Sequence, residues 1–246
     1  MAERAATEAE QRKWEAEAVK AAAEAEKALA ESDKVRQEAR EAAAKAQQAE
    51  LSLASAQRRE QEELVGDKFF NIYRFNSSVE SNSVGACISQ LTTWSRLKPS
   101  CSMEIIFKSP GGSVIDGMVL FDAIEDLRRQ NHHITTSAMG MAASMAGILL
   151  QAGDRRVMHR ECWMLIHEIA FGAIGKIGEI EDTVDWAKRI QARVLDIFAN
   201  RCKLAGEAGT AKHPLTKAQI KKRWARKDWW ISSDQCLDLG LVDEVR

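Results

Sequence analysis

The stretch that decides the fold reads MEIIFKSPGGSVIDGMVLFDAIEDLRR and spans residues 103–129. Its first part, residues 103–109, is a near-continuous apolar run of the kind found in strands covered on both faces of a sheet. A Pro-Gly-Gly turn follows, and from Val114 to Arg129 the apolar residues recur at helical spacing. The stretch therefore predicts a buried strand, a tight turn and an amphipathic helix.

The same alternation of strand and helix continues on both sides of this stretch. Further strands are predicted at residues 68–75, 132–140 (with a loop), 155–158 and 162–166, further helices at residues 83–97, 141–152 and 177–204, and a loop at residues 206–214. This order predicts an α/β fold with a mostly parallel sheet flanked by helices.

Residues 1–65 have a different composition from the rest of the chain. They contain 20 alanines, 15 acidic and 11 basic residues, and the first glycine is Gly66. Alanine and the long charged residues are strong helix formers, and acid–base pairs at helical spacing add support. We therefore expect two parts: one long helix over residues 1–65 and a globular domain over residues 66–246.

A seam of mostly small residues runs along this helix with heptad spacing over five heptads. Its members are Ala18, Ala21, Ala25, Ala28, Ser32, Val35, Ala39, Ala42, Ala46, Ala49 and Leu53. The spacing is that of a coiled coil, but methyl side chains bury little area. The sequence leaves a coiled coil and a solvated single helix equally open.

Charge and composition exclude several classes of protein. The chain has 35 basic and 36 acidic residues, a net charge of -1, so no overall charge favours binding to nucleic acid or anionic lipid. No apolar run approaches the roughly 20 residues of a membrane span, and the N-terminus has no apolar signal core. We therefore expect a cytoplasmic protein that binds neither membrane nor nucleic acid.

Five cysteines are scattered along the chain without a CxxC pair: Cys87, Cys101, Cys162, Cys202 and Cys236. An odd number at irregular spacing argues against a disulfide framework and against a zinc site. We expect buried free thiols, no metal and no cofactor.

Ser144 is the first candidate for chemistry. It lies in SAMGMAASMAGILL, where a strand-like segment meets a predicted helix of small residues. Backbone N–H groups at a helix start can bind negative charge, and small neighbours let a substrate approach. Ala142 and Ala146 stand where a Gly-x-Ser-x-Gly elbow has glycines, so this pattern alone favours a serine that only packs a helix.

Two further segments carry candidate groups. The Pro-Gly-Gly turn ends a strand, where backbone amides could hold an oxyanion, although an ordinary turn is the simpler interpretation. His167 ends the apolar run CWMLIH, a better place for a general base than a loop. The other four histidines lie in polar contexts and are expected at the surface: His132, His133, His159 and His213.

Four motifs in this order resemble the proteolytic subunit of the Clp protease. They read SPGGSVIDGMVLFDAI, GMAASMAGILLQAG, RRVMHRECWMLIHE and DWWISSDQCLDLGLVDEV. The resemblance covers about residues 67–246 and implies the ClpP/crotonase-like fold, a serine endopeptidase that cleaves proteins or peptides, and a homo-oligomer of one ring or two stacked rings. The helix at residues 177–204 fits the protruding helix by which such rings stack.

The resemblance also implies roles for five residues. The family's catalytic serine falls on Ser144, its histidine on His167 and its aspartate on Asp228, counted back from the GLVD segment. Its oxyanion-hole amides fall on Gly112 and Met145. The implied mechanism is acyl transfer through an acyl-enzyme.

Asp228 has an alternative role, because it lies in the basic stretch KKRWARKDWW and could pair with Arg226 or Lys227 at the surface. The basic run with tryptophans also suggests contact with nucleic acid, but one short patch on a neutral protein is weak support for that function.

The chain departs from the family in two places. A long helix replaces the short N-terminal segment that helps the family engage an unfoldase, and Glu168 and Ile169 follow His167 where the family usually has a proline. This divergence resembles the Clp-like capsid-maturation proteases of tailed phages. The replaced segment counts against docking to an AAA+ unfoldase, and by analogy with the phage enzymes the helix is expected to bind a capsid or scaffold partner, with an AAA+ unfoldase as the alternative partner.

Three other functions remain open. One is acyl-CoA chemistry on the same architecture, and another is a serine–lysine peptidase like the signal-peptide peptidases; His167 counts against both. The third is a structural or scaffolding subunit, for example in phage head assembly, with a weak or vestigial triad.

Overall fold

The computed structural model describes residues 2–246, with side chains from Arg12 onward. Contacts divide the chain into an N-terminal helix and a compact unit that begins at Val65. The helix, α1, spans Ala2–Val65, and every side chain from Arg12 to Val65 is exposed, including Trp14 and Leu53. The predicted long helix is confirmed, and its coiled-coil pairing stays a prediction.

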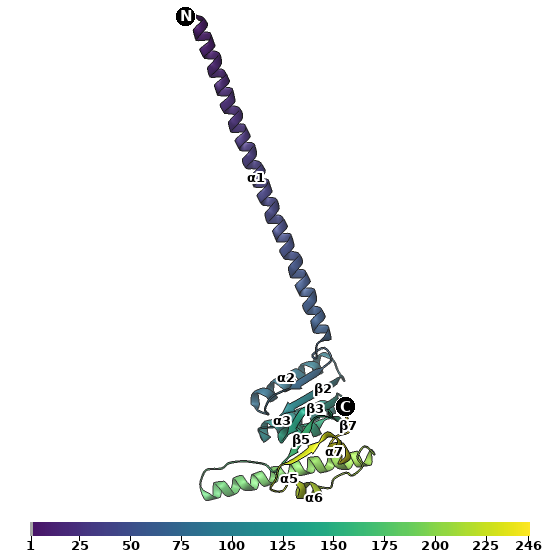
Figure 1. The fold of residues 1–246 in the computed structure, drawn as a ribbon. Coiled ribbons are helices and arrows are strands. Elements are labelled where there is room, and N and C mark those ends of the chain that lie inside the picture. Colours follow the sequence, from purple (N-terminus) through teal and green to yellow (C-terminus); the bar gives the residue numbers. More distant parts are fainter. Residues whose placement is uncertain (1) are drawn as a thin grey trace. The chain divides into compact units, whose positions relative to one another are not determined.

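The compact unit is a seven-stranded sheet with helices around it (Figure 1). Its elements in chain order are β1 (Ile72–Phe75), α2 (Ser81–Leu97), β2 (Ser102–Ser109), α3 (Val114–Arg129), β3 (His133–Ala143), α4 (Met145–Leu149), a 3-10 turn (Leu150–Ala152), β4 (Arg155–Met158), β5 (Trp163–Ile166), α5 (Ile177–Glu207), α6 (Lys217–Trp224), β6 (Trp229–Ser232), α7 (Ser233–Asp238) and β7 (Glu244–Val245). The predicted mixed α/β fold with a mostly parallel sheet is confirmed.

The strand β3 is the branch point of the sheet. One edge of β3 pairs with β2, while the other edge pairs with β4 over residues 135–138 and with β5 over residues 141–143. All of these pairs are parallel, as are β1–β2 and β4–β7. The strand β6 pairs with β5 alone and runs antiparallel to it.

Local predictions failed where strand pairing outweighed local sequence. The predicted helix over residues 141–152 is wrong in its first part, because residues 141–143 form the end of β3, where all three pair with β5 and Ala142 also pairs with Ser109 of β2. The first predicted strand is shorter than residues 68–75, because a turn with left-handed backbone at Asn71 (φ 57°) precedes β1. The segments α6 and β6 were not predicted.

One histidine assignment is wrong. His132 is buried at 4% exposure, and its Nε2 lies 2.8 Å from the Oγ of Ser95. Its Nδ1 lies 3.3 Å from the carbonyl oxygen of Cys101. Hydrogen bonds to both ring nitrogens allow a polar ring to be buried here between α2 and the start of β3.

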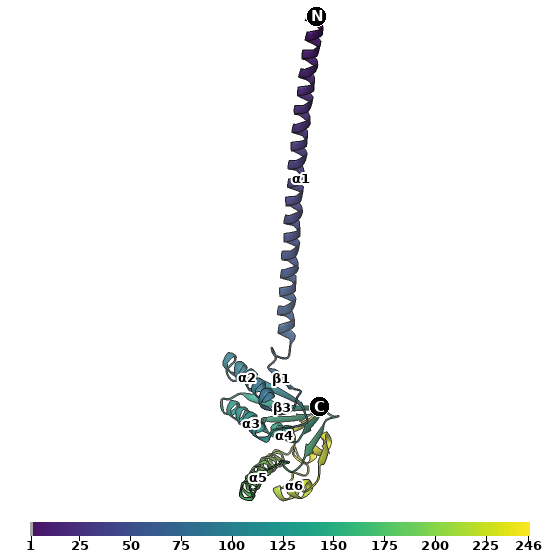
Figure 2. The same cartoon turned by 90° about the vertical axis from the view of Figure 1, so that its left-hand side faces the viewer.

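The core lies between the sheet and its helices. The helices α2 and α3 lie side by side against one face of the strands (Figure 2), where Leu91, Leu120 and Ile124 meet Ile105 and Phe107 of β2 with no exposed surface. The helix α5 has no buried residue before Ala187, and its first part extends away from this core (Figure 1). None of the helices in residues 2–246 combines the length and the hydropathy needed to cross a membrane.

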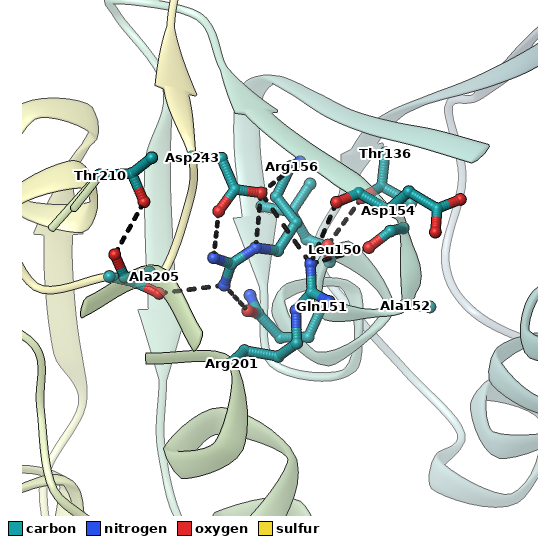
Figure 3. A network of polar contacts seen from close by, with 12 residues as sticks. Thr136, Leu150, Gln151, Ala152, Asp154, Arg156, Arg201, Ala205, Thr210 and Asp243 are labelled. Carbon is teal, nitrogen blue, oxygen red and sulfur yellow. Dashed lines mark hydrogen bonds and ion pairs between the residues drawn. The ribbon is translucent and has the colours of Figure 1, made fainter. Parts of the chain in front are cut away.

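A buried arginine joins β4 to the C-terminal strand (Figure 3). The guanidinium of Arg156 binds both carboxylate oxygens of Asp243, and the backbone N–H of Arg156 also donates to Asp243 Oδ2 at 2.9 Å. Its Nη1 donates to Gln151 Oε1 and to the carbonyl oxygens of Gly240 and Leu241. The motifs RRVM and GLVD, distant in sequence, therefore meet in one ion pair.

Burial and neighbouring positive charge have opposite effects on the pKa of Asp243 in this cluster. Burial by itself raises the pKa of Asp243, but the hydrogen bonds and charge of Arg156, with the nearby charge of Arg201, hold it below its usual range. Burial, and then the charge of Arg156, lowers the pKa of Arg201 to about 10. Asp243 is therefore ionised at neutral pH and balances two clustered guanidinium groups.

Candidate active site

Three neighbouring parallel strands end at one edge of the sheet, and each is followed by a predicted site residue. The Pro-Gly-Gly turn follows β2, Ser144 follows β3, and His167 follows β5. The carboxyl ends of parallel strands meet at the same edge, which is where open α/β sheets bind ligands. The strand order thus brings together Gly112, Ser144 and His167 from three separate segments.

Ser144 lies on a strained turn between β3 and α4. Its backbone has φ 54° and ψ −121°, a region that favours glycine over residues with a side chain. The N–H of Ser144 donates to the carbonyl oxygen of Leu165 in β5 at 2.9 Å, which fixes the turn to the neighbouring strand. Nucleophilic serines of hydrolases occupy sharp strand-to-helix turns of this kind, which expose the hydroxyl oxygen.

The hydroxyl of Ser144 and the ring of His167 form a hydrogen bond. The Ser144 Oγ lies 2.7 Å from His167 Nε2. This is the separation at which a general base can remove the hydroxyl proton. The structure therefore brings together the predicted nucleophile and the predicted base.

Two backbone N–H groups next to Ser144 are free to bind an oxyanion. Gly112 forms an isolated parallel bridge with Val79. The hydrogen bonds of this bridge are made by the neighbours of Gly112: the Val79 N–H donates to Gly111 O, and the Ser113 N–H donates to Val79 O. The N–H of Gly112 therefore points away from the bridge. Met145 is the first residue of α4, so its N–H has no carbonyl oxygen within the helix to bind. In the part of the chain that the structure describes, neither N–H donates a hydrogen bond.

The two glycines of the turn are required by space as well as by backbone angle. Gly111 has φ 90°, and a Cβ there would lie 2.6 Å from the carbonyl oxygen of Ala143. Gly112 has φ 148°, and a Cβ there would lie 2.3 Å from the carbonyl oxygen of Val79. The turn is therefore a close approach of one backbone to another beside the nucleophile, rather than an ordinary surface turn.

Asp228 lies at the same edge, but its side chain is exposed, and residues 12–246 show no hydrogen bond between it and His167. Its backbone position follows from the antiparallel ladder of β5 and β6. The last pair of that ladder is Ile166 with Trp229, and His167 and Asp228 are the residues next to this pair, just beyond the end of the ladder. A further step of the same register would set His167 and Asp228 opposite each other.

A cavity of about 310 Å³ opens beside the serine and histidine. Its inner wall consists of the buried side chains Ile148, Val194, Phe198 and Trp224. Among the described residues that line it, His167 and Glu168 are the ones that can ionise. The lining of the cavity therefore combines buried apolar side chains with the Ser144–His167 pair.

The family comparison agrees with this geometry. The family model described as Clp protease matches residues 69–246. The chain belongs to the Clp protease family. In this Clp protease the match begins after α1, so the long helix lies outside the family's domain.

The structure also identifies residues of the candidate site that sequence reasoning missed. Trp224 and Phe198 form part of the cavity wall, and Glu168 accepts a hydrogen bond from the backbone N–H of Arg226 at 3.1 Å. Helical periodicity in residues 217–224 could have placed Trp224 on a buried face. The contact of Glu168 with Arg226 depends on the β5–β6 pairing, which no local pattern indicates.

No group of three or more His, Cys, Asp or Glu side chains in the described part of this Clp protease is arranged to hold a metal ion. Four of the five cysteines are buried, and burial raises the pKa of Cys202 to about 11 and that of Cys162 to about 12. These thiols are therefore protonated at neutral pH and are poor nucleophiles.

Proposed function

We propose that the chain is a serine endopeptidase that cleaves peptide bonds through an acyl-enzyme, with Ser144, His167 and Asp228 as its triad. The observation that carries this proposal is the 2.7 Å contact between Ser144 Oγ and His167 Nε2, on a strained turn beside two free N–H groups. The membership of the Clp protease family supports it, as does the position of His167 and Asp228 next to the last pair of the β5–β6 ladder.

Each residue has a defined part in the proposed reaction. His167 Nε2 removes the hydroxyl proton while Ser144 Oγ attacks the peptide carbonyl, and the N–H groups of Gly112 and Met145 bind the oxyanion. His167 then returns the proton to the leaving amine, and a water molecule hydrolyses the acyl-enzyme by the reverse sequence. Asp228 orients the imidazole and stabilises its charged form. The apolar wall of the cavity suits an apolar substrate side chain next to the scissile bond.

A fluorophosphonate probe tests the proposal, because it phosphonylates activated serines with loss of fluoride. We expect labelling of Ser144 in the wild type, as located by peptide mass spectrometry, and no labelling in Ser144→Ala. Ser95 offers a matched control, since its Oγ also lies 2.8 Å from a histidine nitrogen but belongs to the helix α2 and lacks the strained turn. Ser95→Ala should label like the wild type.

The opposite result favours the alternative function. A folded protein that never labels on Ser144 would contradict the peptidase proposal. It would support a structural or scaffolding subunit, as in phage head assembly, whose long helix is the functional part.

We further propose that the protein forms rings. Exposed apolar residues on α5 and the segment before it offer a surface for stacking: Phe171, Ile174, Ile177 and Trp186. The helix α1 is then available for a coiled coil, or for an AAA+ unfoldase or capsid partner. A cytoplasmic location stays a prediction.

Removal of residues 1–64 should leave the peptidase unit folded and assembled, because every described side chain from Arg12 to Leu64 is exposed. We expect the truncated protein to keep the fluorophosphonate labelling rate of the full chain within about twofold, and to keep its size in sedimentation. Aggregation of the truncated protein would show that α1 is needed for folding or assembly.

A further inference from the structure

We propose that Glu168 is a positioning residue for the hydrolytic reaction: it holds the turn before β6 so that Asp228 faces His167. This inference rests on the proposed peptidase function and adds a residue to it. The carboxylate of Glu168 acts through the backbone of Arg226 and touches neither the nucleophile nor the scissile bond.

The ladder between β5 and β6 stops one step short of the two catalytic partners. It pairs Leu165 with Trp230 and Ile166 with Trp229, and no ladder pair joins His167 to Asp228 in the described residues. The position of Asp228 therefore depends on the turn that leads into β6, which comprises residues 225–228. A displacement of this turn would move the carboxylate away from the imidazole while leaving β5 in place.

This turn is held by few contacts. Its second residue, Arg226, has left-handed backbone at φ 55°, a conformation that residues with a side chain adopt only when neighbouring contacts impose it. The N–H of Lys227 donates to Trp224 O at 3.3 Å, a contact within the turn itself. The N–H of Arg226 donates to Glu168 Oε2 at 3.1 Å, which ties the turn to the residue after His167.

The Glu168 contact has the properties that such a tie requires. A carboxylate that accepts a backbone N–H makes a charge-assisted hydrogen bond, which is stronger than one between neutral groups. Glu168 is half-buried and lines the active-site cavity, and its hydrogen bond to the Arg226 N–H is exposed to solvent. It therefore connects the two strand ends that carry His167 and Asp228, at the point where their ladder bonds stop.

A double-mutant cycle tests whether Glu168 acts through Asp228. We expect Glu168→Ala to lower kcat for a fluorogenic peptide by about 10- to 100-fold, because a shift of about 1 Å in a catalytic group costs roughly that much. KM should change by less than about twofold. Glu168→Gln keeps an oxygen that can accept the Arg226 N–H, so it should recover most of the rate.

The same substitution is then made in Asp228→Asn. If Glu168 acts by placing the carboxylate of Asp228, Glu168→Ala should have less than about a twofold effect in this background. An equal loss of kcat in both backgrounds would overturn the proposal and assign Glu168 to the substrate or the fold. Unchanged kcat in Glu168→Ala would also overturn it.

A second measurement gives an answer even if hydrolysis is not detected. Hydrogen–deuterium exchange of the backbone amides of residues 225–228, followed by mass spectrometry, reports how firmly this turn is held in the inactive Ser144→Ala protein. Glu168→Ala removes the acceptor of the Arg226 N–H, so it should speed exchange in this segment, whereas Asp228→Asn should leave the exchange rate unchanged.

The comparison of alanine and glutamine separates position from charge. Glu168→Ala should speed amide exchange over residues 225–228, and Glu168→Gln, which removes the same charge but keeps an acceptor, should retain most of the protection. Equal exchange rates in Glu168→Ala and Glu168→Gln would mean that Glu168 acts by its own charge, and the positioning role would be wrong. Failure of Ser144 to label would contradict the peptidase function without deciding this comparison.

Discussion

Ser144→Ala and His167→Ala are each expected to lower kcat for peptide hydrolysis by about 10⁵-fold or more, and the double variant should be no slower than either single variant. The reason is that the hydroxyl and the imidazole, 2.7 Å apart, act as one unit, so removal of one leaves the other without a function. Single-turnover and steady-state assays on the three proteins measure this directly.

Two results would contradict this expectation. Multiplicative losses in the double variant would show that Ser144 and His167 act independently, and wild-type activity in Ser144→Ala would assign the nucleophile elsewhere. Asp228→Asn extends the series: it should cost about 10⁴-fold if Asp228 orients the imidazole. A change of less than about threefold would leave a Ser–His dyad.

The second large effect is expected on stability, at the ion pair between Arg156 and Asp243. Asp243→Ala should lower the free energy of unfolding by about 3–5 kcal/mol, because it leaves the Arg156 guanidinium, whose side chain is 1% exposed, without its counter-charge. The midpoint of thermal unfolding should fall by about 10 °C. Urea unfolding at fixed protein concentration measures the change.

An exposed ion pair supplies the control for this variant. Asp185 and Lys188 of α5 are 2.9 Å apart with side chains 66% and 71% exposed, so Asp185→Ala should leave the unfolding midpoint unchanged within measurement error. Similar losses in Asp243→Ala and Asp185→Ala would show that burial adds nothing to the Arg156 pair.

The pH dependence of the Asp243 contribution follows from the direction of its pKa shift. The folded protein holds the pKa of Asp243 below its ordinary value of 3.8, so the pair stabilises the fold at neutral pH. This contribution is lost as the pH falls below 3.8 and through the lower folded pKa. The stability advantage of wild type over Asp243→Asn should therefore shrink in that acid range and stay constant above it.

Much of the fold followed from local patterns. The helix at Val114–Arg129 and the strand at Arg155–Met158 begin and end at the predicted residues, because hydrophobic periodicity and the flanking turn residues specify them. The helical prediction for residues 141–143 failed because small residues favour a helix locally, whereas pairing to β2 and β5 on both edges favours a strand.

The residues of the candidate site also differ in how far the sequence indicates them. Ser144 was assigned through the resemblance of its motif to the family, since its own pattern favoured a serine that only packs a helix, whereas His167 was also favoured because it ends an apolar strand-like run. Asp228 was assigned by the same resemblance, and its surroundings do not indicate it, since the stretch KKRWARKDWW is typical of a charged surface and its position next to the β5–β6 ladder depends on an antiparallel pairing. The contact of Glu168 with Arg226 joins residues 58 positions apart, which no sequence spacing reveals.

The strained turn at Ser144 has a consequence for evolution and for engineering. Its backbone, at φ 54° and ψ −121°, suits glycine, and holding a serine there costs on the order of 1 kcal/mol. Selection for thermal robustness alone would therefore favour loss of the hydroxyl at this position, and only selection for turnover would retain it. A library screened for heat resistance should accumulate inactive Ser144→Gly variants. Attempts to raise the thermal stability of this protein therefore need to keep residue 144 fixed.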